Sequence, residues 1–251
     1  MKKLIPFDTD TRNIPLPTQL NDPFTVPDEQ HPLVALAVRQ LQHHLATQTE
    51  WHHNFGLGHE NEDSSLKPIG KMFGVLVVQT AAQELGFLAA FSGKLAGGNH
   101  HSYFVPPVLD SLSEDTFLNR GMRALKGIND EIKQLELAGC KATHQLMMLK
   151  EKRKAHSQGL QSQLFDAYRF LNAAGEHRTP KDLFTTPPAG AGECAAPKLL
   201  QYAYQQHLTP LAIAEFWWGV PPNTAISTRS HEAYYPACDD KCRGVLGWML
   251  N

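Results

Sequence analysis

Lys71-Met-Phe-Gly-Val-Leu-Val-Val-Gln-Thr80 and Leu85-Gly-Phe-Leu-Ala-Ala-Phe-Ser-Gly-Lys94 are the two stretches that decide the fold of this chain. Both are rich in β-branched and aromatic residues, and a short polar link joins them. Two such runs separated by a few residues predict an antiparallel β-hairpin. Because both runs are apolar almost throughout, we expect other elements to cover the sheet on both faces.

Helical and extended patterns surround the hairpin. Upstream, Pro32 occupies a position that the first turn of a helix tolerates, and apolar residues at helical spacing predict a helix over 32–47. Downstream, we expect a helix over 192–206, an apolar strand over 210–218 and a final helix that opens at Pro236. The prolines within residues 1–30 predict an extended lead-in that packs over other elements, because helix interiors and central strands exclude proline.

Residues 119–172 carry a different pattern, that of two long helices. The first has apolar positions at steps of three and four, which is typical of a two-helix coiled coil: Leu125, Ile128, Ile132 and Leu135. Residues 139–143 can turn the chain. The second helix is then predicted to carry Leu146, Leu149, Leu160, Leu164, Tyr168 and Leu171.

The predicted fold class is therefore α+β. A small sheet with flanking helices is formed by residues 31–118 and 179–251, and a long antiparallel helical hairpin is inserted over 119–178. The chain has 251 residues, which is enough to bury a core in one large domain or two small ones.

Composition narrows the class of protein. Lys plus Arg number 23 and Asp plus Glu number 25, so the net charge of −2 gives no global attraction to nucleic acid. No run reaches the roughly 18 apolar residues that a membrane span needs. Pro6 and Asp8 interrupt the apolar start, which does not fit a signal peptide. We expect a cytoplasmic protein with no membrane partner.

Three of the four cysteines are candidate zinc ligands. Cys238 and Cys242 are four residues apart on the final predicted helix, and Cys194 lies at the start of another. Helix N-termini stabilise thiolates, and three thiolates can hold zinc with one position left for water or a fourth ligand. Packing as reduced, small apolar side chains is the alternative. Cys140 is expected to be a free thiol in the turn between the two long helices.

The order of elements resembles that of the cytidine deaminase-like fold: a helix, a hairpin, a ligand-bearing helix, a strand and a Pro-x-Cys-x-x-x-Cys helix. The resemblance places Cys194, Cys238 and Cys242 on the zinc ligands of that fold. Two features depart from the pattern. The second cysteine spacing is one residue longer, and Ala196 stands where the family has its proton-shuttling Glu. Glu193 is nearby, but one residue along a helix turns a side chain by about 100°. The resemblance therefore implies a deaminase-like scaffold without deaminase activity.

Three further segments resemble the long N-terminal region of a bacterial subgroup of RluA-type RNA pseudouridine synthases. They are residues 71–78 with 85–95, residues 165–176, and residues 190–200 with Tyr235-Pro-Ala-Cys238. In that family a separate catalytic domain follows, and its His-Arg-Leu-Asp motif carries the attacking Asp. This chain has no such motif. The resemblance implies an accessory region whose partners are ribosomal or transfer RNA and a C-terminal catalytic domain.

The local charge pattern is consistent with an RNA partner. Residues 120–154 hold nine Lys or Arg against four acidic residues. Lys150, Lys152, Arg153 and Lys154 lie on about one helical turn, and a projecting basic arm suits contact with RNA phosphates. An ordinary solvated helical face is the alternative.

Of the adjacent Trp217 and Trp218, one can offer a stacking face to a base, and at least one is expected in the core.

Three functions remain open on the sequence. The favoured one is an accessory, RNA-binding or RNA-positioning region of a pseudouridine synthase. The alternatives are an independent zinc-dependent deaminase of a nucleoside or base, and an interaction module that works through the coiled-coil arm.

Overall fold

A five-stranded sheet forms the centre of the molecule. The computed structural model of the chain describes residues 3–111, 116–139, 143–222 and 229–251. Neighbouring strands are all antiparallel, in the order β1-β3-β2-β6-β7. The predicted hairpin is β2 and β3, and the predicted α+β class is confirmed. The strands are β1 (Ile5–Pro6), β2 (Lys71–Gln79), β3 (Leu85–Phe91), β6 (Thr209–Trp218) and β7 (Tyr234–Tyr235).

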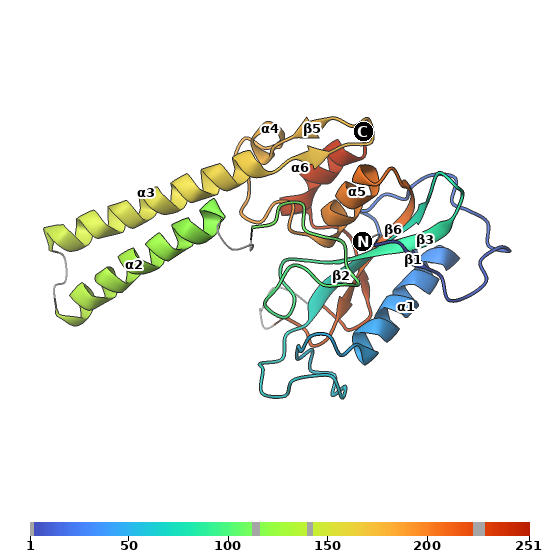
Figure 1. The fold of residues 1–251 in the computed structure, drawn as a ribbon, viewed down its shortest axis with the longest axis horizontal. Helices are drawn as coiled ribbons and strands as arrows, with labels where there is room; N and C mark the ends of the chain where they lie inside the picture. Colours follow the sequence, from blue (N-terminus) through green and yellow to red (C-terminus); the bar gives the residue numbers. More distant parts are fainter. Residues whose placement is uncertain (1–2, 112–115, 140–142, 223–228) are drawn as a thin grey trace.

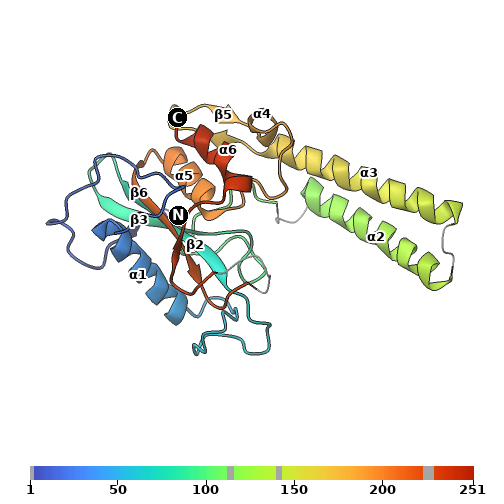
Figure 2. The same ribbon diagram turned by 180° about the vertical axis from the view of Figure 1, so that it is seen from behind.

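Helices cover both faces of the sheet, as the apolar strands predict. α1 (Pro32–Thr47) lies on one face, and α5 (Ala195–Gln205) and α6 (Asp239–Met249) lie on the other (Figures 1 and 2). Side chains of β2 alternate between two cores. Phe73, Val75 and Val77 pack in the α1 core, and Leu76 and Val78 pack in the α5–α6 core. All five are fully buried, and burying each stabilises the fold by roughly 1.5–3 kcal/mol.

The N-terminal segment packs over the sheet, as predicted, and adds a short strand to it. Ile5 and Pro6 pair with the outer edge of β3, a position that tolerates proline. Further along, the side chain of Asn21 exchanges two hydrogen bonds with the backbone of Ile213, at 3.0 and 2.8 Å. The N–H of Ala237 donates to the carbonyl of Pro23 at 2.8 Å. The segment therefore fastens β6 and the chain just before α6.

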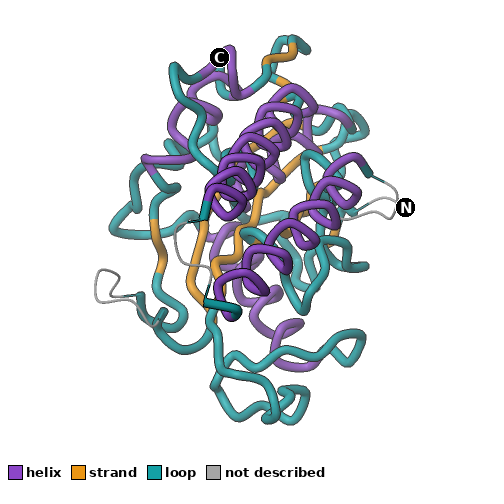
Figure 3. Tube along the Cα trace, turned by 90° about the vertical axis from the view of Figure 1, so that its left-hand side faces the viewer, coloured by secondary structure: helices purple, strands orange, loops and turns teal. Residues whose placement is uncertain are grey.

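Two long helices, α2 (Phe117–Leu137) and α3 (His144–Ala167), lie side by side and project from the rest of the molecule (Figures 1 and 3). Ile128, Ile132 and Leu146 form their small buried core. These residues belong to the predicted apolar seam. Cys140 lies outside the described residues.

The second long helix is shorter than predicted. α3 ends at Ala167, so Tyr168 and Leu171 lie beyond it. Tyr168 and Phe170 stack with their ring centroids 5.4 Å apart inside the α5–α6 core, where aromatic rings bury more surface than at a solvated helix end. Tyr168 and Phe170 therefore pack in the α5–α6 core, although they precede the predicted boundary at residue 178. Residues 168–178 contain β4 (Phe170–Leu171) and β5 (His177–Arg178), which pair, followed by α4 (Pro180–Leu183).

Among the described helices, none combines the length and the apolar character that crossing a membrane would require.

Candidate metal centre

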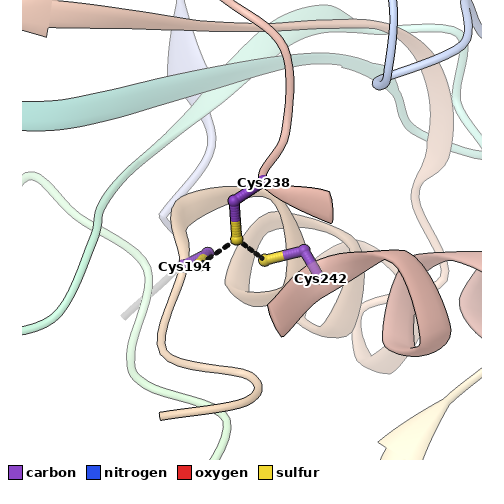
Figure 4. Close-up of side chains that lie close together, drawn as sticks. All are labelled: Cys194, Cys238 and Cys242. Atoms are coloured by element: carbon purple, nitrogen blue, oxygen red, sulfur yellow. Dashed lines mark hydrogen bonds between the residues drawn. The ribbon is translucent and has the colours of Figure 1, made fainter. Parts of the chain in front are cut away.

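Three cysteine sulfurs meet where two helices begin. Cys194 is the N-cap residue of α5, Cys238 is the N-cap residue of α6, and Cys242 lies in the first turn of α6. Their Sγ atoms lie within 4.8 Å of one another, with 3.7 Å between Cys194 and Cys238 and 3.3 Å between Cys238 and Cys242 (Figure 4). The structure thus brings all three predicted ligands together. Since α6 begins at Asp239 and not at Pro236, Cys238 precedes the helix instead of lying on its face.

The spacing of the sulfurs fits a single tetrahedral metal ion. Zn–S bonds of about 2.3 Å at tetrahedral angles place two sulfurs about 3.8 Å apart. A disulfide requires about 2.05 Å between its sulfurs, and all three cysteines are free thiols. The set is therefore compatible with zinc, and three protein ligands would leave a fourth position for another group.

Glycines allow the two helix starts to approach each other and the sheet. A Cβ on Gly74 of β2 would lie 3.0 Å from Ala195 Cβ, so the glycine lets the first turn of α5 pack closely on the sheet. Gly192 has a φ of +85°, which glycine adopts readily, and it turns the chain toward Cys194 against Phe170. Because α5 and α6 both begin here, the positive ends of two helix dipoles favour negative charge on the sulfurs.

Cys238 occupies the middle of the cluster. Hydrogen bonding with the sulfurs of Cys194 and Cys242 lowers the pKa of the Cys238 thiol. Contact with Cys238 raises the pKa of Cys194, and contact with the other two sulfurs raises the pKa of Cys242. Without a cation, the cluster thus favours one thiolate held by two thiols, and a metal ion must displace the remaining protons to bind all three sulfurs.

A buried carboxyl group that the sequence analysis did not single out lies beside the cysteines. Glu215 of β6 is 6% exposed, and its Oε1 accepts the N–H of Ala196 at 3.1 Å. Burial raises the pKa of Glu215 to about 7 and outweighs the opposing effect of the Ala196 hydrogen bond. Ala196 is the residue that stands where the deaminase resemblance has its glutamate. Strand β6 therefore supplies a carboxyl group next to the position at which α5 lacks one.

The sheet register makes room for this carboxyl group. Glu215 is paired with Gly74 across β2 and β6, and a Cβ on Gly74 would lie 3.4 Å from Glu215 Cγ. The sequence did carry a signal, a single acidic residue inside the apolar strand predicted over 210–218. A buried acid is costly unless it has partners, so such a residue is a candidate for a functional role.

Two other charged residues near the cysteines have structural contacts. Glu193 accepts a hydrogen bond from the hydroxyl of Tyr168. Lys198, one turn into α5, is 2% exposed, and its Nζ donates to the backbone carbonyls of Phe91 at 2.9 Å and Gly93 at 3.1 Å. Burial lowers the pKa of Lys198 to about 8. Its hydrogen bonds tie the end of β3 to α5 and so help to fix the position of Cys194.

Cys194 and Cys238 share one cavity with Glu215. The cavity has a volume of about 420 Å³, within the range of small-molecule sites, and its walls include Cys194, Cys238, Glu215 and Trp217. Trp218 instead packs in the α1 core. One tryptophan thus lines the cavity and the other is a core residue, because adjacent strand residues face opposite sides.

The four basic residues predicted to bind RNA are exposed on α3, but they do not share one face. Lys150, Arg153 and Lys154 line a shallow groove toward α2, and Lys150 Nζ pairs with Glu136 at 2.8 Å. Lys152 lies elsewhere, beside Met148. The four residues thus occupy about one turn of α3, with Lys152 on another side of the helix, since successive helix positions are about 100° apart.

Comparison with known proteins identifies no relative, because no family model, no curated protein and no solved structure matches this chain. The site is therefore interpreted from its own chemistry.

Proposed function

We propose that this chain is a zinc-dependent hydrolytic domain of the deaminase type, which removes an exocyclic amino group from a nucleobase. The observation that carries the proposal is the placement of Glu215 in the cavity of Cys194 and Cys238, at the backbone of Ala196. The order of the hairpin, α5, β6 and α6 supports a deaminase-like scaffold with the α2–α3 pair as its insertion. Since β6 supplies a carboxyl group, the alanine at position 196 is no longer an argument against activity.

Zinc held by Cys194, Cys238 and Cys242 would supply an open coordination position and lower the pKa of water bound there. Glu215 takes a proton from the attacking water at a carboxyl oxygen and passes it to the departing nitrogen. The water oxygen forms the new C–O bond, the C–N bond breaks, and the amino group leaves as ammonia without any change of oxidation state. A pKa of Glu215 near 7 suits this exchange, because both protonation states are then accessible near neutral pH.

Zinc content and ammonia release test the proposal. We expect about one zinc per chain, and loss of that zinc when Cys194 or Cys238 is changed to Ser. Ammonia release is measured for the zinc-loaded chain with cytosine- and adenine-containing nucleosides, nucleotides and short RNAs.

Glu215→Gln is the matched variant. Its amide oxygen can still accept the N–H of Ala196, but the amide cannot carry the proton. We expect this variant to keep its zinc and to release ammonia about 10²–10⁴ times more slowly. A chain that binds no zinc, or a zinc-loaded chain that releases no ammonia from any of these compounds, overturns the proposal.

The basic side chains of α3 favour a second candidate, a region that binds and positions RNA for a pseudouridine synthase. Lys152, Arg153 and Lys154 are exposed, and within the described ranges none of them forms an ion pair. They are therefore available to phosphates. Changing these three residues and Lys150 together to Glu is expected to weaken binding of structured RNA and to flatten its salt dependence. Unchanged affinity would contradict this role.

A further inference from the structure

Positively charged side chains line the cavity beside the cysteines without forming ion pairs among the described residues. Lys71 at the start of β2, Arg229 before β7 and Lys241 in α6 share the cavity with Cys194 and Glu215. In the part of the chain that the structure describes, none of these three cationic groups has an Asp or Glu oxygen within the 4.0 Å ion-pair distance. The carboxyl groups of Glu215 and Asp240 line the same cavity, and the charge of Arg229 acts on Glu215, but none of the three cationic groups is held in a direct ion pair.

Lys71 is the most informative of these groups. Its side chain is half-buried, and burial lowers the pKa of its ammonium group without a compensating acidic neighbour. Removing an ammonium group from water is costly when no anion or hydrogen bond replaces the water. A bound anion would offset that cost.

The guanidinium group of Arg229 lies over two aromatic rings. Its guanidinium carbon lies 5.3 Å from the ring centroid of Trp217 and 5.0 Å from that of Tyr235, and Nη1 contacts Met72 Sδ at 3.6 Å. These cation–π contacts restrain the guanidinium group, and sulfur is a weak acceptor. The N–H groups of Arg229 thus remain suited to the two-point hydrogen bonding that phosphate oxygens accept.

Lys71 is not needed to balance the negative charge of the cysteine thiolates. Lys198 already lies close enough to Cys194 for that thiol to act on its pKa, and it is anchored to two backbone carbonyls. Lys71 has neither an acidic neighbour of that kind nor, within the described residues, a hydrogen bond that holds its ammonium group. The two lysines therefore have different roles, and Lys71 is the one directed to a ligand.

We infer that Lys71 and Arg229 form a phosphate-binding subsite, so that the ligand of the cavity is a nucleotide and not an uncharged nucleoside. The inference rests on the proposed function and names the substrate class of the same site. A free nucleoside monophosphate and a nucleotide within an RNA chain present the same chemistry, a negatively charged phosphate beside a base.

Calorimetric titration of the full, zinc-loaded chain tests the subsite. The probes are cytidine and adenosine, their 5′-monophosphates, inorganic phosphate and a short single-stranded RNA. We expect at least one phosphate-bearing nucleotide probe to bind about tenfold more tightly than the matching nucleoside, a difference typical of one charge-assisted contact.

Variants assign this preference to the two residues. Lys71→Met keeps the apolar stem and is expected to remove the preference, and Arg229→Lys, which keeps the charge but loses the planar fork, is expected to reduce it. Lys133→Met on α2 removes an exposed positive charge outside the cavity and is expected to leave monophosphate affinity unchanged. Zinc content of each variant reports that the cysteine centre is intact.

The outcomes separate the ligand sources and the two proposals. Preference for a free monophosphate identifies a free nucleotide as the ligand, and preference for the RNA alone identifies a nucleotide within a chain. Equal affinity for nucleosides and every phosphate-bearing probe, or unchanged affinity in Lys71→Met and Arg229→Lys, overturns the subsite. A zinc-loaded chain without phosphate preference overturns the subsite alone, whereas a chain that binds no zinc overturns the proposed function.

Discussion

The sheet with its covering helices and the α2–α3 pair differ in how many layers of side chains exclude water. The sheet lies between two cores, whereas the helix pair has one small core of Ile128, Ile132 and Leu146. Among the described residues, the first arrangement buries charged groups such as Glu215 and Lys198 almost completely. The charged groups of α3 remain exposed. Burial in the sheet region can therefore shift the pKa of reactive groups, whereas the helix pair can act on a partner through surface charge and shape.

The largest expected difference between the two regions is in how their variants respond to removal of the metal. If zinc binds the three cysteines, it stabilises the folded chain by about 4 kcal/mol when free zinc exceeds its dissociation constant a thousandfold. Thermal unfolding with zinc and with a chelator measures this effect. Cys242→Ser is expected to abolish the zinc dependence, because it removes a buried ligand, whereas Ile132→Ala is expected to preserve it. If a chelator does not change the unfolding temperature of the parent chain, zinc binding at the cysteines does not stabilise the fold.

Matched core truncations compare the two regions directly. Leu76→Ala opens a cavity between β2 and α5 and is expected to cost about 2–5 kcal/mol of global stability. Ile132→Ala is expected to lower the free energy of unfolding by about 2 kcal/mol, because the small core of the helix pair can collapse around the gap. Hydrogen exchange checks where each effect falls. Ile132→Ala should accelerate exchange in α2 and α3 while the sheet stays protected, and accelerated exchange of β2 in this variant would show that the regions unfold together.

The buried carboxyl group gives the sheet body a pH dependence. Because the folded, metal-free chain raises the pKa of Glu215 from 4.5 to about 7, the folded state binds a proton that the unfolded state releases between these pH values. The contribution of Glu215 to stability therefore falls as pH rises through this window, by at most about 3 kcal/mol. Urea unfolding at pH 5 and pH 7.5 with a chelator, for the parent chain and Glu215→Gln, measures the effect. The stability of the parent relative to the variant should decrease with pH, and a constant difference would contradict the assignment.

Charge changes on α3 are expected to have the smallest effect on stability. Lys152→Glu and Lys154→Glu alter exposed side chains, so the free energy of unfolding should change by about 0.5 kcal/mol or less. Lys150→Glu also breaks the ion pair with Glu136, and an exposed pair contributes about 0–1 kcal/mol. Thermal unfolding of the single variants checks these values. A loss as large as that of Leu76→Ala would mean that the basic residues serve the fold.

Local pattern predicted most of the elements. The helix at 32–47 has the bounds of α1, and the hairpin and the strand at 210–218 match β2, β3 and β6 closely. These elements are decided by the spacing of apolar residues along a few turns or one strand. The end of α3 was not predicted, since Tyr168 keeps helical spacing with Leu164 but is buried by contacts with a core built from distant segments.

The α+β class, the two-sided burial of the sheet and the choice of three cysteines as a ligand set all follow from local patterns in the sequence, because periodicity and helix starts are local properties. Three contacts could not be predicted locally: Cys194 lies against Cys238, Glu215 of β6 contacts Ala196 of α5, and Lys71 and Arg229 line the same cavity. Each of these contacts joins segments separated along the chain. Distances across a sheet depend on register and on how closely helices pack upon it, and at Gly74 a single missing Cβ sets that approach.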